Sequence, residues 1–96
     1  MADVKEAARR LLGALNKHQG HDREGATVHL GEQEARTAGL RPGSAVYRAA
    51  VWWLLDVGAL VPNEEANKQL RNTAGAQHRG FVFKITQRGL NILRGA

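Results

Sequence analysis

The 96-residue sequence contains no cysteine, so disulfides and thiolate chemistry are excluded, and the reducing cytoplasm is the expected location. It also lacks an apolar run of the roughly 20 residues that a membrane span needs. The most apolar stretch, 44–61, is shorter and is interrupted by Arg48 and Asp56. The start of the chain is charged from Asp3 onward and has no apolar signal-peptide core. We therefore expect no membrane contact.

Residues that usually carry catalysis or hold metals are also scarce. Ser44 is the one serine and stands at a helix-cap position, which argues against a Ser-His-Asp device. His18 and His21 lie three residues apart beside Asp22, as in a metal pair, but no third or fourth ligand follows at a recognisable spacing. No glycine-rich phosphate motif occurs. The sequence therefore predicts neither an enzyme nor a metal or cofactor site.

Positive charge collects in the last third of the chain. The net charge is +5, and residues 62–96 carry six cations against Glu64 and Glu65, whereas residues 1–43 are nearly balanced. A basic region attracts polyanions such as nucleic acid, because binding releases counterions. The same charge also suits a plain solvated surface, so charge alone leaves both interpretations open.

Apolar periodicity and capping residues predict one domain, residues 1–96, of mixed helices and strands. Apolar residues recur at helical spacing over 4–15 after the N-cap Asp3, and again after Ser44, which also suits an N-cap. Gly39 and Gly58 follow helical segments and suit left-handed caps. In chain order the expected elements are a helix at 4–17, a loop at 18–26, a strand at 27–30, a short helix from 31 that ends at Gly39, a helix at 44–57, strands at 59–61 and 81–86, and a helix at 87–94. The last two strands should pair.

The link between these two strands, residues 62–80, is long for a hairpin. Its first half has helix signals, with an N-cap at Asn63 and acids placed before bases. Ala66 and Leu70 are the only apolar residues in that half, too few to anchor a helix to a core. We therefore expect a long wing-like loop at 62–80, of which a part could be helical.

Two patches of the sequence resemble one known family. GLRPGSAVYRAAVWWLLDVGALV resembles the second half of a winged helix-turn-helix, and KITQRGLNIL is similar to the strand-Thr-x-x-Gly-x-x-x-Leu ending of MarR- and PadR-like DNA-binding regulators. The matching residues are Gly39, Leu40, Ser44, Val46, Tyr47, Arg48, Ala49, Leu54, Gly58, Leu60, Val61, Ile85, Thr86, Gly89 and Leu93. The resemblance covers residues 4–94 in element order but only these patches in residues. It implies an α+β winged helix-turn-helix, with a three-helix core, a small antiparallel sheet and a short C-terminal helix.

The helix expected at 44–57 departs from that family. A recognition helix usually carries several polar or basic residues on its outer face, because base edges are read by hydrogen bonds. Here one side should face the core, with Trp53 near its centre, and the opposite side carries Val51, Trp52 and Leu55. These three could be buried beneath the sheet, form a dimer or partner interface, or stack on nucleic acid. Trp52 should be at least partly accessible in a monomer.

A set of apolar residues should form the core, and a set of polar ones should meet DNA. The residues expected to be mostly buried are Leu11, Leu15, Val46, Ala50, Trp53, Leu54, Val57, Phe83 and Leu90. The DNA candidates at the start of the recognition helix are Arg41, Ser44, Tyr47 and Arg48. Those in the long loop, suited to phosphate or the minor groove, are Lys68, Arg71, His78 and Arg79. The simpler interpretation is a helix cap and solvated charges.

The sequence therefore predicts a small winged-helix protein that binds duplex DNA, as a transcriptional regulator or accessory factor, either alone or as a homodimer. The alternative is a winged-helix interaction or dimerisation module without DNA reading. A single arginine on the outer face, Arg48, favours the alternative, whereas the basic last third favours DNA. RNA or ribosome association is a third interpretation that charge alone supports.

Overall fold

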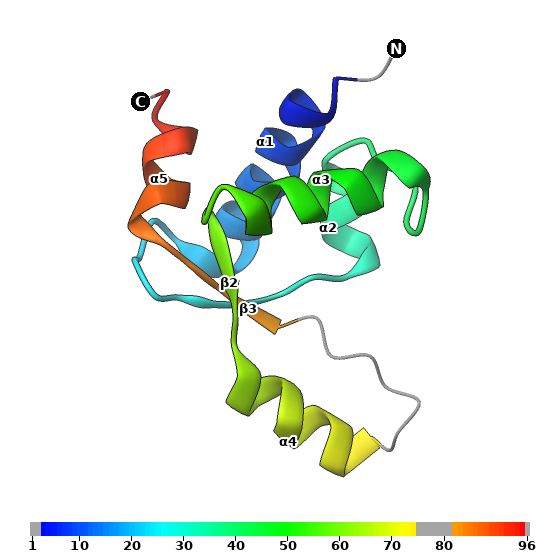
Figure 1. Cartoon of the computed structure of the whole chain (residues 1–96), viewed down its shortest axis with the longest axis vertical. Helices are drawn as coiled ribbons and strands as arrows, with labels where there is room; N and C mark the ends of the chain where they lie inside the picture. The colour runs from blue at the N-terminus through cyan, green and yellow to red at the C-terminus, as the bar shows by residue number, and fades with distance from the viewer. Residues whose placement is uncertain (1–2, 75–81, 96) are drawn as a thin grey trace.

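The structure, a computed structural model, describes residues 3–74 and 82–95, and the side chains of 3–69 and 82–95. The elements are α1 (Val4–Leu15), the wide helical turn η1 (Asn16–Gly20), β1 (Thr27–His29), α2 (Glu32–Thr37), α3 (Ala45–Asp56), β2 (Leu60–Pro62), α4 (Glu64–Ala74), β3 (Val82–Ile85) and α5 (Gln87–Leu93). The strands form an antiparallel sheet in the order β1-β3-β2 (Figure 1). The predicted α+β fold with a small antiparallel sheet and a short C-terminal helix is confirmed. Within the described ranges, no helix is long and apolar enough to cross a membrane.

The side-chain caps that the sequence predicts are present. The Asp3 carboxylate accepts hydrogen bonds from the backbone N–H groups of Lys5 and Glu6, and the Ser44 hydroxyl accepts one from Tyr47 at 3.2 Å. Such a cap typically contributes about 1 kcal/mol, because it satisfies an N–H that the helix leaves unpaired. These bonds fix where α1 and α3 begin.

Two glycines end α2 and α3 in the same way. Gly39 and Gly58 have φ values of +75° and +78°, in the left-handed region that glycine adopts without a steric penalty. The N–H of Leu40 then reaches the carbonyl of Ala35 at 2.8 Å, and the corresponding bond after α3 measures 2.9 Å. The chain therefore reverses sharply into the α2–α3 turn and into β2, as predicted.

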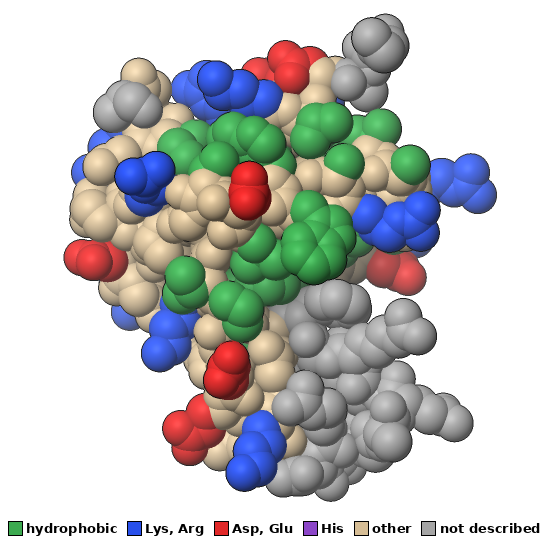
Figure 2. Space-filling view, in the orientation of Figure 1, with side chains coloured by type: hydrophobic (Ala, Val, Ile, Leu, Met, Phe, Trp, Pro, Cys, Tyr) green, Lys and Arg blue, Asp and Glu red, His purple; other side chains and the backbone are tan. Residues whose placement is uncertain are grey.

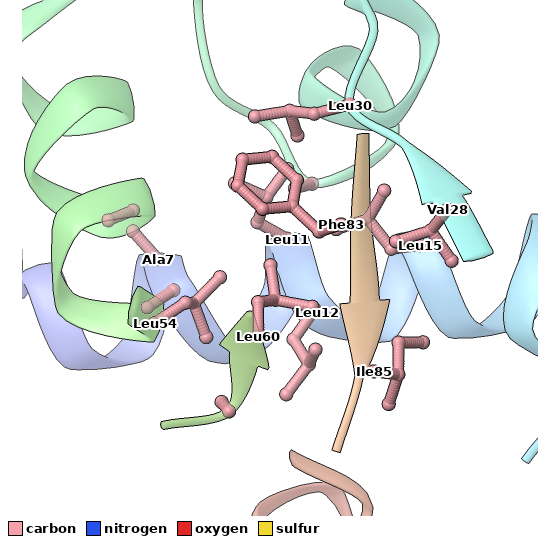
Figure 3. Packing of buried hydrophobic residues seen from close by; sticks show 14 of the residues in the cluster. Ala7, Leu11, Leu12, Leu15, Val28, Leu30, Leu54, Leu60, Phe83 and Ile85 are labelled. Atoms are coloured by element: carbon pink, nitrogen blue, oxygen red, sulfur yellow. The ribbon is translucent and has the colours of Figure 1, made fainter. Parts of the chain in front are cut away.

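The core lies between α1, α3 and the inner face of the sheet. Figure 3 shows the three leucines of α1, Leu11, Leu12 and Leu15, behind β2 and β3, with Leu54 of α3 to one side. All four side chains are fully buried. The predicted pairing of the last two strands is confirmed, with Leu60 opposite Ile85.

Most of the predicted core is buried, but α3 is rolled relative to the prediction. The predicted core residues that are buried are Leu11, Leu15, Ala50, Leu54, Phe83 and Leu90. Val46, Trp53 and Val57 pack against the edge of the cluster and are mostly buried, as predicted, but they do not lie at its centre. The helical wheel predicted from the sequence has Val46 at the centre of the buried face. At 100° per residue, the midpoint of the fully buried Ala50 and Leu54 lies about 60° from Val46. Ala50 and Leu54 therefore form the centre of the buried face of α3, and Trp53 lies toward its edge.

Residues 18–20, predicted as loop, instead belong to the helical turn η1. The Gln19 side-chain amide holds this turn: it donates to the carbonyl of His29 at 2.8 Å and accepts from the N–H of His29 at 2.7 Å. Gly20 is buried against Ile85, and a Cβ at this position would come within 2.5 Å of the Ile85 side chain. The loop prediction failed because these contacts come from strands distant in sequence.

The predicted wing-like loop at 62–80 is largely a helix. Helix α4 begins after Asn63, whose side-chain oxygen accepts from the N–H of Ala66 at 3.2 Å, so the capping signal is confirmed. Figure 1 shows α4 standing away from α1, α2 and α3. The prediction that it lacks an anchor was wrong, because a polar residue, Asn67, is buried against β3 and replaces the missing apolar contacts. Residues 75–80 of the predicted loop lie outside the described residues.

Candidate functional site

Helix α3 exposes one narrow stripe of side chains. Its exposed residues are Ala45, Arg48, Trp52 and Asp56. Steps of three or four residues place them on one side of the helix. Trp52 is 71% exposed, the larger of the two exposed bulky apolar side chains that the described chain presents. Its predicted accessibility is therefore confirmed.

The exposed stripe has a defined order of chemistry along the helix. Arg48 comes first, Trp52 lies one turn later and Asp56 one turn after that. Figure 2 shows a green patch beside the middle of α3, between blue side chains toward its start and a red one toward its end. The stripe is therefore a cation, a large apolar group and an anion in sequence.

An apolar groove of about 390 Å³ runs beside this stripe, between α3, the sheet and α4. Its walls on α3 are Tyr47, Arg48, Val51, Trp52 and Leu55. The other walls are Leu30, Pro62, Asn67 and Phe83. The structure thus brings the three predicted interface residues together with two predicted DNA contacts.

The predicted interface face is only partly free. Trp52 is exposed, whereas Val51 and Leu55 are half-buried and pack against the core cluster. Val51 and Leu55 therefore line the groove beside Trp52 and do not form an exposed face of their own. The same roll of α3 that moved Trp53 toward the edge turned Val51 inward.

The predicted DNA contacts at the start of α3 differ in their freedom to bind. Arg41 and Arg48 are exposed, while Ser44 is partly buried and already caps α3. Tyr47 is half-buried, and burial, followed by the negative charge of Glu34, raises its pKa above the ordinary value of 10.0. Among described side chains the ion pair is Arg36–Glu32 at 3.2 Å, so neither Arg41 nor Arg48 belongs to one there.

The second set of predicted DNA contacts is described only in part. Lys68 is exposed on α4, next to the buried Asn67. Arg71 lies in the same helix, but its side chain is outside the described residues. His78 and Arg79 also lie outside the described residues. Lys68 is therefore the one member of this set whose side chain the structure describes.

A second groove was not foreseen from the sequence. It has a volume of about 770 Å³ and lies between α1, the end of α3 and α5. Its walls are Lys5, Arg9, Trp53, Val57, Gln87, Arg88, Asn91, Ile92 and Gly95. The sequence does carry one signal for this groove, because Lys5 and Arg9 are one turn apart on α1 and make a basic edge. The residues of α5 that complete the groove are distant in the chain and could not be assigned to it.

The histidine pair near the end of α1 does not converge on a metal geometry. His18 lies with Nε2 3.5 Å from the hydroxyl of Thr37, and Asp22 accepts a hydrogen bond from the Asn16 amide at 2.8 Å. Across residues 3–74 and 82–95, no three His, Asp or Glu side chains cluster closely enough to hold an ion. These residues stabilise the turn after α1, where His21 and Asp22 both have positive φ.

Comparison with known proteins assigns this chain to no family. The chain matches no protein-family model, no curated protein and no solved structure. The candidate site therefore consists of the exposed stripe of α3, the groove beside it and the cations around them.

Proposed function

We propose that the protein is a winged helix-turn-helix domain that binds duplex DNA in the cytoplasm, as a small transcriptional regulator or accessory factor. The order of elements supports this: three helices, of which the last two are joined by a short turn, precede a hairpin that pairs with β1. The residues that carry the family resemblance also have physical roles here. Gly39, Ser44 and Gly58 set the ends of α2 and α3, and Thr86 caps α5.

The exposed arginines at the start of α3 are the observation that carries the proposal. Arg41 and Arg48 are both exposed and engage no acid among the described side chains. In this fold the N-terminal part of the recognition helix meets base edges in the major groove, and an arginine there reads guanine through two hydrogen bonds. Arg48 is therefore the proposed base contact, with Arg41 on the neighbouring phosphate.

Helix α4 and the residues that follow it in the sequence supply the proposed contacts to the DNA backbone. Lys68 is exposed on it, and Arg71, His78 and Arg79 follow in the sequence. Contacts from such residues to phosphate fix orientation and carry no sequence information. Their contribution should depend strongly on salt, because each neutralised phosphate releases counterions.

Fluorescence anisotropy with random-sequence duplex DNA across a salt series tests the proposal. Replacing Lys68, Arg71 and Arg79 together by alanine should weaken binding about equally for all sequences and flatten the salt slope, by about one unit for each lost phosphate contact. Arg48→Ala should instead reduce discrimination at one base pair. No binding by the wild-type protein at about 50 mM salt would overturn the proposal, since the electrostatic contribution is largest at low salt.

A second candidate function is protein interaction without DNA reading, and one observation favours it. The exposed stripe of α3 has Trp52 at its centre and a single cation, and an apolar groove lies beside it. Tryptophan is enriched among the residues that dominate the affinity of protein interfaces. Trp52→Ala separates the two functions: it should abolish association with a protein partner while leaving the salt-dependent part of DNA binding intact.

A further inference from the structure

We propose that two copies of this chain associate through α3, with the two helices antiparallel and the two-fold axis passing beside Trp52. This inference deepens the second candidate function, because it names the partner as a second copy of the chain. It depends on the order of Arg48, Trp52 and Asp56 on the exposed stripe and does not require DNA binding.

The spacing of the stripe is symmetric about the indole. Arg48 and Asp56 are each four residues from Trp52, which corresponds to about 6 Å along the helix axis on either side. A two-fold axis at Trp52 reverses the second helix, so Arg48 of one copy comes opposite Asp56 of the other, and the same pair occurs twice. The stripe is therefore complementary in charge to itself, and only in the antiparallel direction.

Both charges are available for this pairing. Arg48 and Asp56 are exposed, and the ion pair found among the described side chains involves neither of them. The stripe as a whole carries no net charge, so a polyanion gains nothing from its C-terminal half, where Asp56 would repel phosphate. A second copy satisfies both ends of the stripe at once.

The apolar part of the interface explains why the association should be reversible. Each indole can bury up to about 150–250 Å², and the groove walls Val51 and Leu55 lie beside it. One helix from each side gives an interface below the roughly 1,200–2,000 Å² of stable complexes. We expect a concentration-dependent equilibrium between monomer and dimer rather than a permanent dimer.

Charge reversal provides the experiment, read out by sedimentation velocity from dilute solution up to about 1 mM. Arg48→Asp places two carboxylates together in both halves of the dimer, and Asp56→Arg places two guanidinium groups together, so each variant alone should be monomeric. Mixing the two variants should restore a heterodimer, because both contacts then join either the two introduced charges or the two original ones, which are opposite in sign. The double variant R48D/D56R should dimerise by itself.

Matched controls separate this geometry from a general effect of charge. Arg23→Asp and Glu24→Arg change the net charge equally in an exposed loop away from α3, and both should dimerise as the wild type does. Trp52→Ala should be monomeric with an unchanged circular dichroism spectrum. Its unfolding midpoint should equal that of the wild type in dilute solution, where both are monomers.

The proposal is overturned if the wild type stays monomeric up to that concentration, or if mixing the two single variants fails to restore a dimer that the wild type forms. Since no DNA is present, neither result bears on the DNA-binding proposal, whose failure would appear only in the anisotropy titration.

Discussion

The side-chain amide of Asn67 takes the place of a neighbouring strand at Val82, the first residue of β3. It donates to the carbonyl of Val82 at 3.0 Å and accepts from the N–H of Val82 at 2.8 Å. The N–H of Asn63 still pairs with the carbonyl of Val82 at 2.9 Å, but the carbonyl of Asn63 accepts from the N–H of Asn67 instead, within α4. Asn67 therefore provides the acceptor that the chain loses when it turns from β2 into α4.

Loss of this amide should destabilise the protein more than loss of an exposed one. Asn67→Ala leaves the N–H of Val82 buried without a partner, which should lower the free energy of unfolding by about 1–3 kcal/mol. Asn91→Ala, which removes an exposed bond to Gln87, should change it by no more than about 0.5 kcal/mol. Urea denaturation measures both, and equal effects would contradict the role assigned to Asn67.

The same substitution should have opposite effects at two helical glycines. A Cβ on Gly89 would lie 2.5 Å from the carbonyl oxygen of Ala59, which is backbone and cannot move aside. A Cβ on Gly13 would meet Leu93 at 3.7 Å, an ordinary contact. Gly13→Ala should therefore raise the free energy of unfolding by roughly 0.5–1 kcal/mol, because alanine favours the helix.

Gly89→Ala should instead lower it, by roughly 1–3 kcal/mol as for an overpacked site, because α5 must move away from Ala59. The hydroxyl of Thr86, which accepts from the N–H of Gly89 at 3.1 Å and donates to the carbonyl of Gly58 at 2.5 Å, should lose its geometry at the same time. Thermal unfolding of the two variants side by side measures the difference. A stabilising effect at position 89 would mean that α5 does not approach Ala59 as described.

The features that were predictable from the sequence are those that neighbouring residues determine. Asp3, Ser44, Gly39 and Gly58 each act within one turn of helix, so the ends of α1, α2 and α3 follow from local chemistry. The pairing of β2 with β3 also follows, because both segments carry strand residues in the right order.

The features that were missed depend on partners far along the chain. Gln19 acts ten residues away on His29, and Asn67 acts fifteen away on Val82, so neither amide could be recognised from its neighbours. The rotation of α3 depends on its packing against other elements, which buries Ala50 and Leu54, and a helical wheel drawn from α3 alone places Trp53 too deep. The candidate site was predicted only in part for the same reason. Trp52 was identified from its own helix, whereas the groove walls from β2, β3 and α4 are distant in the chain and were missed.

Tyr47 should make stability depend on pH in the alkaline range. Its pKa is raised by burial and then by Glu34, so the folded chain holds the phenol proton more tightly than the unfolded chain does. Unfolding then releases a proton between the two pKa values, and stability should fall as pH rises above about 10. Because Tyr47 is the one tyrosine, tyrosinate absorbance follows it directly in native and denatured protein.

Two variants assign the cause of that shift. Tyr47→Phe should remove the tyrosine contribution to the alkaline loss of stability, and Glu34→Gln should lower the pKa of Tyr47 only part of the way, because burial is the larger cause. A phenol that titrates identically in the native and the denatured chain would contradict the half-buried position of Tyr47.

The adjacent indoles should report different surroundings. Trp52 is 71% exposed, whereas Trp53 is partly buried between α1, α3 and α5. In dilute solution, Trp53→Phe leaves Trp52 as the single fluorophore, and acrylamide should quench it steeply. Trp52→Phe leaves Trp53, whose emission should be shifted to shorter wavelength and quenched weakly.

Trp53→Ala should lower the free energy of unfolding by about 3 kcal/mol, at the low end for a tryptophan because part of the ring already meets solvent. Trp52→Ala should leave the free energy of unfolding unchanged within about 0.5 kcal/mol in the monomer.

If α3 associates with a second copy, raising the protein concentration should protect Trp52, but not Trp53, from quenching by acrylamide. Equal quenching of both indoles at every concentration would contradict both the orientation of α3 and the interface built on it.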